Sequence, residues 1–161
     1  MPYSFDTDVF IELKRSSSDN DRLWEILGRR MDSRDILVSR EVVVEIQRGT
    51  DTLIDRIRTH PRCIVETDNT IQKYVTKLVN KYLGWVNPAS TRNLADPYVI
   101  AVAGVHHGYV VTLERANQFL LEHPEQWANQ TTGLKIPNIC EMEHIPHLNS
   151  VDYLIATGTF T

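Results

Sequence analysis

The sequence predicts an α/β domain of three layers, in which a short-stranded, mainly parallel central sheet is flanked by helices. Two observations lead to this prediction. Short apolar segments alternate with longer segments whose apolar residues recur three and four apart, which is typical of βαβ units. No internal repeat, low-complexity tract or linker interrupts the alternation, and 161 residues is the length of one ordinary domain. We therefore expect a single domain over residues 1–161.

The expected strands are all short. They cover residues 3–5, 36–38, 64–65, 109–111 and, with the weakest pattern, 146–148. The helical spacing of apolar residues predicts helices over residues 22–31, 41–49, 52–60, 71–84, 97–108 and 151–158. Two of these helices are preceded by capping residues: Ser39 before the second, and Asn149 or Ser150 before the last.

The helix expected over residues 97–108 has signals at both ends. Asp96 stands directly before Pro97, a residue favoured at the first helical position, and Gly108 stands where a left-handed cap would lie. Residues 99–105 are apolar almost all round the helix, which predicts a central, buried element. Asp96 would then lie at the mouth of the core.

The stretch from Ala116 to Gly133 is the least regular part of the chain. Pro124 interrupts a short apolar run, and a polar tail follows Trp127. We expect a mobile loop or insertion at about residues 116–133.

Composition excludes several classes of protein. The hydrophobic content of 42% and the charged content of 24% are those of a globular domain, and no run approaches the ~18 apolar residues of a membrane span. The first residues lack the pattern of a secretory signal, so we expect a cytoplasmic protein with no membrane partner. Two isolated cysteines argue against a disulfide framework or a thiolate zinc site. The net charge of −4 gives no global signature of nucleic-acid binding, so such binding would depend on local patches.

Several polar residues follow the expected strands directly. In an open parallel sheet, ligands bind beyond the carboxyl ends of the strands, so these positions are informative. They are Asp6, Thr7 and Asp8 after the first strand, Glu45 on the helix after the second, Asp96 at the start of the buried helix, and Thr112 and Glu114 after the fourth strand.

Acidic groups gathered at one edge would raise one another's pKa values unless a divalent cation neutralised them. Oxygen ligands favour Mg²⁺ or Mn²⁺. Zinc is disfavoured because the six histidines form no HxxxH pair, and the adjacent His106 and His107 cannot face one point. Taken singly, the acids have simpler explanations: Asp6, Asp8 and Asp96 as helix caps, and Glu45 and Glu114 as surface charges.

The segments FDTDVFIEL, SREVVVEI, ADPYVIAVA and YVVTLE, in this order, resemble the motifs of the PIN domain, the ribonuclease fold of many bacterial toxin–antitoxin toxins. The tail KIPNICEMEHIPHLNSVDYL resembles one PIN-like subfamily, so the similarity spans nearly the whole chain. The resemblance implies a metal-dependent endoribonuclease that hydrolyses RNA phosphodiester bonds with Mg²⁺ or Mn²⁺. An antitoxin protein and a homodimer are the protein partners it leaves open.

The resemblance also assigns roles to residues. It implies metal ligation and catalysis by Asp6, Glu45, Asp96 and Glu114, with Thr7 and Thr112 as supporting hydroxyls. Two positions depart from the family pattern, which often has Asn or Ser in place of Asp8 and an Asp in place of Glu114. Asp8 is therefore either a fifth ligand, a hydrogen-bond acceptor or a cap. The basic residues nearest the motifs, and so the candidates for binding the RNA backbone, are Arg40, Arg92, Arg115 and Lys135.

Two other functions fit part of the pattern. A haloacid-dehalogenase-type phosphatase would use Asp6 as nucleophile and Asp8 as acid, but it also needs a late acidic pair and a lysine, and Asp96 with Pro97 supplies only one acid. A non-catalytic PIN-like module that binds RNA or a protein is the second alternative. The complete set of acids argues against it.

Overall fold

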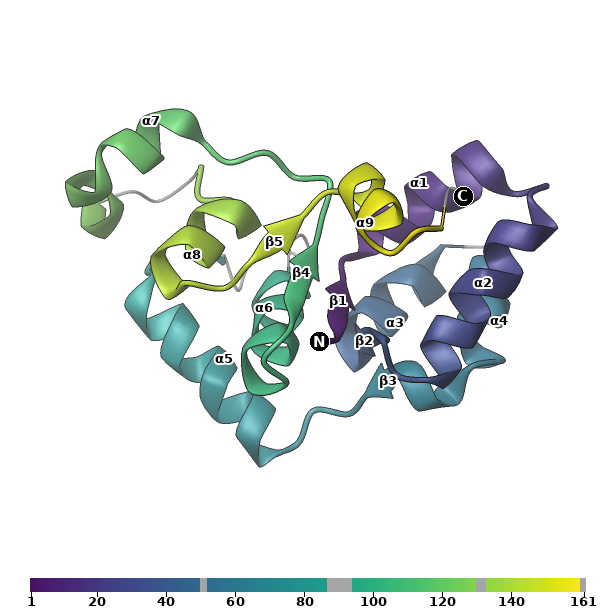
Figure 1. Ribbon diagram of the computed structural model, residues 1–161. Coiled ribbons are helices and arrows are strands. Elements are labelled where there is room, and N and C mark those ends of the chain that lie inside the picture. The colour runs from purple at the N-terminus through teal and green to yellow at the C-terminus, as the bar shows by residue number, and fades with distance from the viewer. Residues whose placement is uncertain (50–51, 87–93, 130–132, 160–161) are drawn as a thin grey trace.

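Five short parallel strands form the central sheet of the computed structural model, which describes residues 1–49, 52–86, 94–129 and 133–159 (Figure 1). The strand order is β3-β2-β1-β4-β5. The strands are β1 (Tyr3–Phe5), β2 (Ile36–Ser39), β3 (Ile64–Val65), β4 (Tyr109–Val111) and β5 (His147–Leu148). The predicted α/β class, the parallel sheet and all five predicted strands are confirmed.

The described residues form nine α-helices and two 3-10 helices. The α-helices are α1 (Thr7–Ser17), α2 (Asp21–Asp32), α3 (Arg40–Arg48), α4 (Leu53–Arg58), α5 (Asn69–Lys81), α6 (Asp96–Val105), α7 (Gln118–Glu122), α8 (Ile136–Glu143) and α9 (Ser150–Ala156). The 3-10 helices are Pro61–Cys63 and Pro124–Asn129. None of these helices has the length and apolar character needed to cross a membrane.

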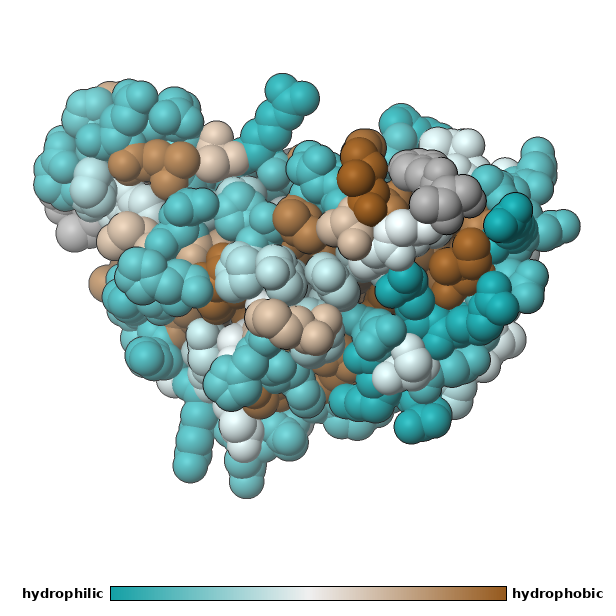
Figure 2. Space-filling model, in the orientation of Figure 1, coloured by the Kyte–Doolittle hydropathy of each residue, from teal (hydrophilic) through white to brown (hydrophobic). Residues whose placement is uncertain are grey.

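The helices cover both faces of the sheet, which gives the predicted three layers (Figure 1). Alternation along β2 shows the two faces: Ile36 and Val38 pack into the large core with α1 to α4, whereas Leu37 packs with α5 and α6. On the first face, the ring of Tyr153 from α9 lies edge-on to Phe5, with 4.9 Å between the ring centroids. The face of the molecule in Figure 2 is mostly hydrophilic, with apolar side chains in separate patches.

Strand order reverses between β1 and β4, because β2 follows on one side of β1 and β4 lies on the other. In open α/β sheets, ligands bind at such a switch point, beyond the carboxyl ends of the strands. The register places Phe5 opposite Val111, so Asp6 and Thr112 leave their strands side by side. The fold therefore brings together the acidic motif that follows β1 and the one that follows β4.

Two details of the predicted helix ends differ from the structure. Asp96 is the first residue of α6, Ala95 is its N-cap, and no side-chain cap hydrogen bond is formed, so the predicted capping role of Asp96 is wrong. His107, not Gly108, has the left-handed backbone, with φ 54°. Gly108 is needed for close approach instead, since a Cβ there would lie 2.2 Å from the Pro2 carbonyl oxygen. The Ser39 cap is confirmed, and Asn149 caps α9.

The segment expected to be a mobile loop or insertion, residues 116–133, contains α7 and the second 3-10 helix. Trp127 is buried there, and its indole Nε1 donates a 2.6 Å hydrogen bond to the Leu120 carbonyl. Its ring also packs against Tyr82. Residues 130–132 lie outside the described residues, and the mobility of this segment stays a prediction.

Candidate active site

Asp6 is held at the end of β1 by hydrogen bonds to both of its carboxyl oxygens. Oδ1 accepts from the backbone N–H of Thr7 at 2.8 Å, and Oδ2 accepts from the hydroxyl of Thr112 at 2.9 Å. Asp6 is also the N-cap of α1. Both Asp6 and Thr112 are buried, with exposed fractions of 5% and 2%. Asp6 can therefore cap α1 and belong to the candidate site at the same time.

Glu45 reaches this region from the other side of β1. The Thr7 hydroxyl donates a 2.5 Å hydrogen bond to Glu45 Oε2, which connects the first residue of α1 to the middle of α3. Glu45 lies beside the buried stripe of α3 and is half-buried. Each of the two predicted supporting hydroxyls, Thr7 and Thr112, thus contacts one acid.

Asp96 is presented by α6, which crosses β1, β2 and β4. The buried hydroxyl of Ser4 on β1 donates a 2.7 Å hydrogen bond to the Val99 carbonyl in the first turn of α6. Because a carbonyl in a helix normally bonds within the helix, this extra bond fixes the start of α6 against the strand. Ser4 was not among the residues predicted from the sequence, where a serine inside a short strand gives no distinctive signal.

Glu114 is joined to α8. Its Oε2 accepts a 2.8 Å hydrogen bond from the backbone N–H of Ile136, the first residue of α8, and its own N–H donates to the Thr112 hydroxyl at 3.1 Å. A carboxylate at a helix N-terminus is favoured by the free N–H groups and the helix dipole. This contact leaves Oε1 of Glu114 for another ligand.

Asn138 is fully buried and holds the turn that carries Glu114. Its Oδ1 accepts from the backbone N–H groups of Asn117 at 2.9 Å and Lys135 at 3.2 Å, and its Nδ2 donates to the Asn117 carbonyl at 3.0 Å. Sequence reasoning missed this residue. The only available signal was an asparagine at the third position of a helix that was itself not predicted.

Asp8 lies close to Asp6 and is half-buried. Burial is the main cause that raises the pKa values of both Asp6 and Asp8, and the two carboxyl groups also interact with each other. The backbone N–H of Leu113 also donates to Asp8 Oδ1, at 3.4 Å. The acidic group therefore has five members rather than four.

The five carboxyl groups act on one another electrostatically. Burial raises the pKa of Asp96 to about 8, with further contributions from the charges of Glu114, Glu45 and Asp8. Burial, followed by the charges of Asp8 and Asp96, raises the pKa of Asp6 well above its usual range. The pKa values of Asp8 and Glu114 are also raised, mainly by burial. Without a cation, this site retains protons that isolated carboxyl groups would lose at neutral pH.

The donor set fits a hard divalent cation. It consists of carboxylate oxygens with hydroxyls beside them, and such ligands suit Mg²⁺ or Mn²⁺. Among the described residues, no three His, Cys, Asp or Glu side chains already stand at metal-binding spacing. The acids therefore lie within range of charge–charge interaction rather than at coordination distance. Ion binding would therefore require side-chain movements, which relief of the repulsion favours.

The four basic residues predicted to hold the RNA backbone have different surroundings. Arg40 forms an ion pair with Glu66, with Nε 3.1 Å from Oε2. Lys135 is exposed, and its charge lowers the pKa values of Asp96 and Glu114. Arg115 is exposed and lines a cavity. Arg92 lies outside the described residues.

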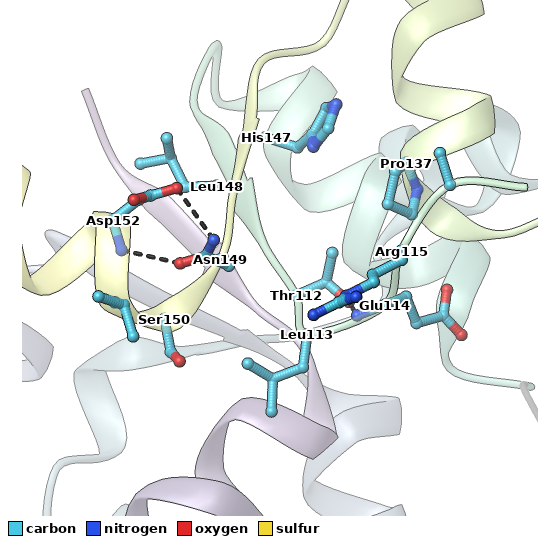
Figure 3. A pocket seen from close by; sticks show the side chains of 12 residues that line it. Thr112, Leu113, Glu114, Arg115, Pro137, His147, Leu148, Asn149, Ser150 and Asp152 are labelled. Carbon is cyan, nitrogen blue, oxygen red and sulfur yellow. Dashed lines mark hydrogen bonds between the residues drawn. The ribbon is translucent and has the colours of Figure 1, made fainter. Parts of the chain in front are cut away.

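Two cavities border the acids. One, of about 560 Å³, lies among the ends of β4 and β5 and the start of α9, and Thr112 and Glu114 form part of its wall (Figure 3). The other, of about 380 Å³, lies between α3 and the pair α5 and α6, and Glu45 forms part of its wall. The acidic group therefore has space for a ligand on both sides.

Comparison with known proteins gives one match. The model of a family described as "Domain of unknown function (DUF4411)" matches residues 3–160. No curated protein and no solved structure matches the chain.

Proposed function

Since the chain belongs to the DUF4411 family, whose description assigns no activity, we propose from the site itself that this protein is a Mg²⁺- or Mn²⁺-dependent endoribonuclease. The observation that carries the proposal is the convergence of five carboxyl groups at the switch point between β1 and β4. These groups come from α1, α3, α6 and the two strand ends. Burial, together with the charges of neighbouring acids, raises the pKa values of Asp6 and Asp96. A group of this kind is suited to bind a divalent cation together with a phosphate.

The residues proposed to hold the ion are Asp6, Glu45, Asp96 and Glu114, with Asp8 beside them. A bound Mg²⁺ or Mn²⁺ would supply Lewis-acid stabilisation of the phosphate and activation of water. Thr7 and Thr112 orient Glu45 and Asp6 through their hydroxyls. Lys135, exposed beside Glu114, adds a positive charge that favours a phosphate. RNA rather than DNA is proposed because the motifs resemble those of PIN ribonucleases.

The phosphatase alternative has less support. A phosphorylated aspartate would require Asp6 to be an ionised nucleophile, but burial and the negative charges of Asp8 and Asp96 raise its pKa. The charges that act on Asp6 are those of carboxylates, whereas this mechanism also needs a lysine at the nucleophile. Labelling of Asp6 by beryllium fluoride would nevertheless favour this alternative.

The test is cleavage of an end-labelled, single-stranded RNA by the purified protein. We expect cleavage in Mg²⁺ or Mn²⁺ and loss of cleavage in excess EDTA, restored by adding the metal back. The control is Asp55→Asn, which removes an exposed carboxylate on α4 and should leave cleavage unchanged. Undiminished cleavage in EDTA would disprove the metal mechanism. RNA binding without cleavage in any metal would support the non-catalytic alternative.

A further inference from the structure

We propose that the cavity among β4, β5 and α9 binds one nucleotide of a single-stranded RNA, directly next to the phosphate at the acidic group. The proposal rests on the ribonuclease function proposed above and adds where the substrate strand lies. It also assigns Arg115 to an RNA phosphate.

The first argument is continuity with the acidic group. The cavity wall includes Thr112, which contacts Asp6, and Glu114, one of the proposed ligands. A ligand in this cavity therefore has one end within reach of the acids. The volume of about 560 Å³ lies in the range of ~300–1,000 Å³ typical of small-molecule sites.

The second argument is the chemistry of the lining. Leu113, Leu148 and Pro137 supply apolar surface for a base or a ribose, and His147 and Asn149 supply polar groups. The Asn149 amide already donates to Asp152 Oδ2 at 2.9 Å and accepts from the Asp152 N–H at 2.8 Å. His147 Nε2 likewise lies 2.9 Å from Glu141 Oε1. Because these atoms of His147 and Asn149 are engaged, the cavity should select a nucleotide by shape rather than by the identity of its base.

The third argument is the direction of Arg115. Figure 3 shows its guanidinium extending across the cavity, while the neighbouring Glu114 side chain turns the other way. A guanidinium can bind two phosphate oxygens at once, so it is well suited to the backbone of the bound strand. The two neighbouring side chains after β4 therefore point in different directions, Glu114 away from the cavity and Arg115 across it.

The second cavity is a poorer match for a nucleotide. Its walls include the apolar side chains of Val75, Val79 and Val86, together with the acids Glu41 and Glu45. Oε2 of Glu41 is buried without a hydrogen-bond partner among the described residues. Arg48 on the same wall offsets part of this negative charge, so the difference between the two cavities is one of size. At about 380 Å³ this cavity is smaller than the one on the β5 side, at about 560 Å³, and we place the nucleotide in the larger one.

The bound RNA must be single-stranded, because a base can enter such a cavity only after it leaves its stacked and paired position in a duplex. In duplex RNA the base edges are held inside the helix, and opening a pair costs free energy. The shape of the cavity therefore predicts a preference for unpaired RNA.

The test fills the cavity without changing charge. Val151 lines the cavity and is 56% exposed, and Ile155, one turn further along α9, is 63% exposed and is not part of the lining. Val151→Trp should block the cavity, and Ile155→Trp is the matched control. Arg115→Ala is paired in the same way with Arg22→Ala, an exposed arginine on α2. All four changes are made in an Asp6→Asn background that should not cut RNA.

Binding is measured in excess Mg²⁺ by fluorescence anisotropy with a labelled, unstructured RNA and with the same RNA in a duplex. We expect Val151→Trp and Arg115→Ala to weaken single-strand binding by about tenfold or more, and the two controls to change it by less than about twofold. Equal affinities for Val151→Trp and Ile155→Trp, or no binding of RNA by the Asp6→Asn protein, would overturn the proposal. Equal affinity for duplex and single strand would do the same.

Cleavage measurements separate the two proposals. If wild-type protein cuts RNA and Val151→Trp cuts it with unchanged kcat/KM, the nucleotide site is wrong and the ribonuclease function stands. If RNA binds in the cavity-dependent way described but wild-type protein does not cut it, the ribonuclease function is wrong and the nucleotide site stands.

Discussion

The hydroxyl of Thr112 donates a 2.9 Å hydrogen bond to Oδ2 of Asp6, which precedes it by 106 residues in the chain. The same hydroxyl accepts a 3.1 Å hydrogen bond from the backbone N–H of Glu114. One buried side chain therefore positions an acid from β1 and an acid from β4. These are the two strands between which strand order reverses, so the contact fixes the geometry where the fold opens toward a ligand.

Thr112→Val should disturb the site while preserving the shape of the core. Valine keeps the volume but removes the donor to Asp6 and the acceptor for Glu114. We expect a loss of about 1–3 kcal/mol in the free energy of unfolding, measured by urea denaturation, because two buried polar groups lose a partner. RNA cleavage should fall as well. Thr76→Val, which removes an exposed hydroxyl on α5 from its bond to the Gln72 carbonyl, is the control. Equal effects of the two changes would contradict the positioning role.

Asparagine substitutions should separate the roles of the three aspartates in the acidic group. Asp6→Asn and Asp96→Asn should each abolish cleavage with the fold intact, as judged by circular dichroism, because each removes a proposed metal ligand. Asp8→Asn should be milder, since an amide oxygen can still accept the hydrogen bond from the Leu113 N–H. Equal losses of kcat in all three variants would mean that the ligands are wrongly assigned.

Metal binding should raise the melting temperature. A ligand that binds only the folded state contributes RT ln(1 + [L]/Kd), which is ~2.7 kcal/mol at a hundredfold excess over Kd and corresponds to a shift of several degrees. Asp96→Asn should be at least as stable as wild type in chelator, because the amide has no charge to bury beside the other acids, and it should lose most of the metal-induced shift. Calorimetry at constant ionic strength measures both quantities. An unchanged shift in the variant would show that Asp96 binds no metal.

Much of this arrangement could be predicted from the sequence. Short apolar runs bounded by polar residues marked β2, β3 and β4, whereas β1 and β5 each have a polar residue inside and gave a weaker pattern. The periodicity of the longer segments marked most helices. The parallel sheet then placed Asp6 and Thr112 at one edge without further information, because carboxyl ends of parallel strands lie together. Residues 99–105 are apolar almost all round the helix, and this pattern correctly predicted that α6 is buried.

Other features depend on contacts that one-dimensional patterns do not record. The helices α1 and α8 were not predicted, although each has a start signal: Asp6 is the N-cap of Thr7–Ser17, and Ile136–Glu143 has a proline at its second position. The bonds from Ser4 to α6 and from Asn138 to Asn117 join residues distant in sequence through common polar side chains. The ion pair of Arg40 with Glu66 likewise requires β2 and β3 to be neighbours.

The stability of the metal-free protein should decrease as pH rises. The pKa of Asp96 is about 8 in the folded protein, against its ordinary value of 3.8, so the folded state retains a proton that the unfolded state has lost. A pKa that is higher in the folded state stabilises the fold fully at pH values below the unfolded-state pKa. This contribution to the free energy of unfolding is lost progressively between about pH 4 and pH 8. The raised pKa values of Asp6, Asp8 and Glu114 act in the same direction.

Melting temperatures in chelator at about pH 5.5 and pH 8.5 measure this dependence. Wild type should melt several degrees lower at the higher pH, because its carboxyl groups must then ionise beside one another in a buried site. Asp96→Asn should show a distinctly smaller decrease, since its amide does not titrate, whereas the exposed control Asp55→Asn should follow wild type. Saturating Mg²⁺ should reverse the trend, because the ion binds the deprotonated carboxylates and must compete with protons below the Asp96 pKa of about 8. A wild-type protein whose stability in chelator is flat or rises across this range would show that the five carboxyl groups do not share one site.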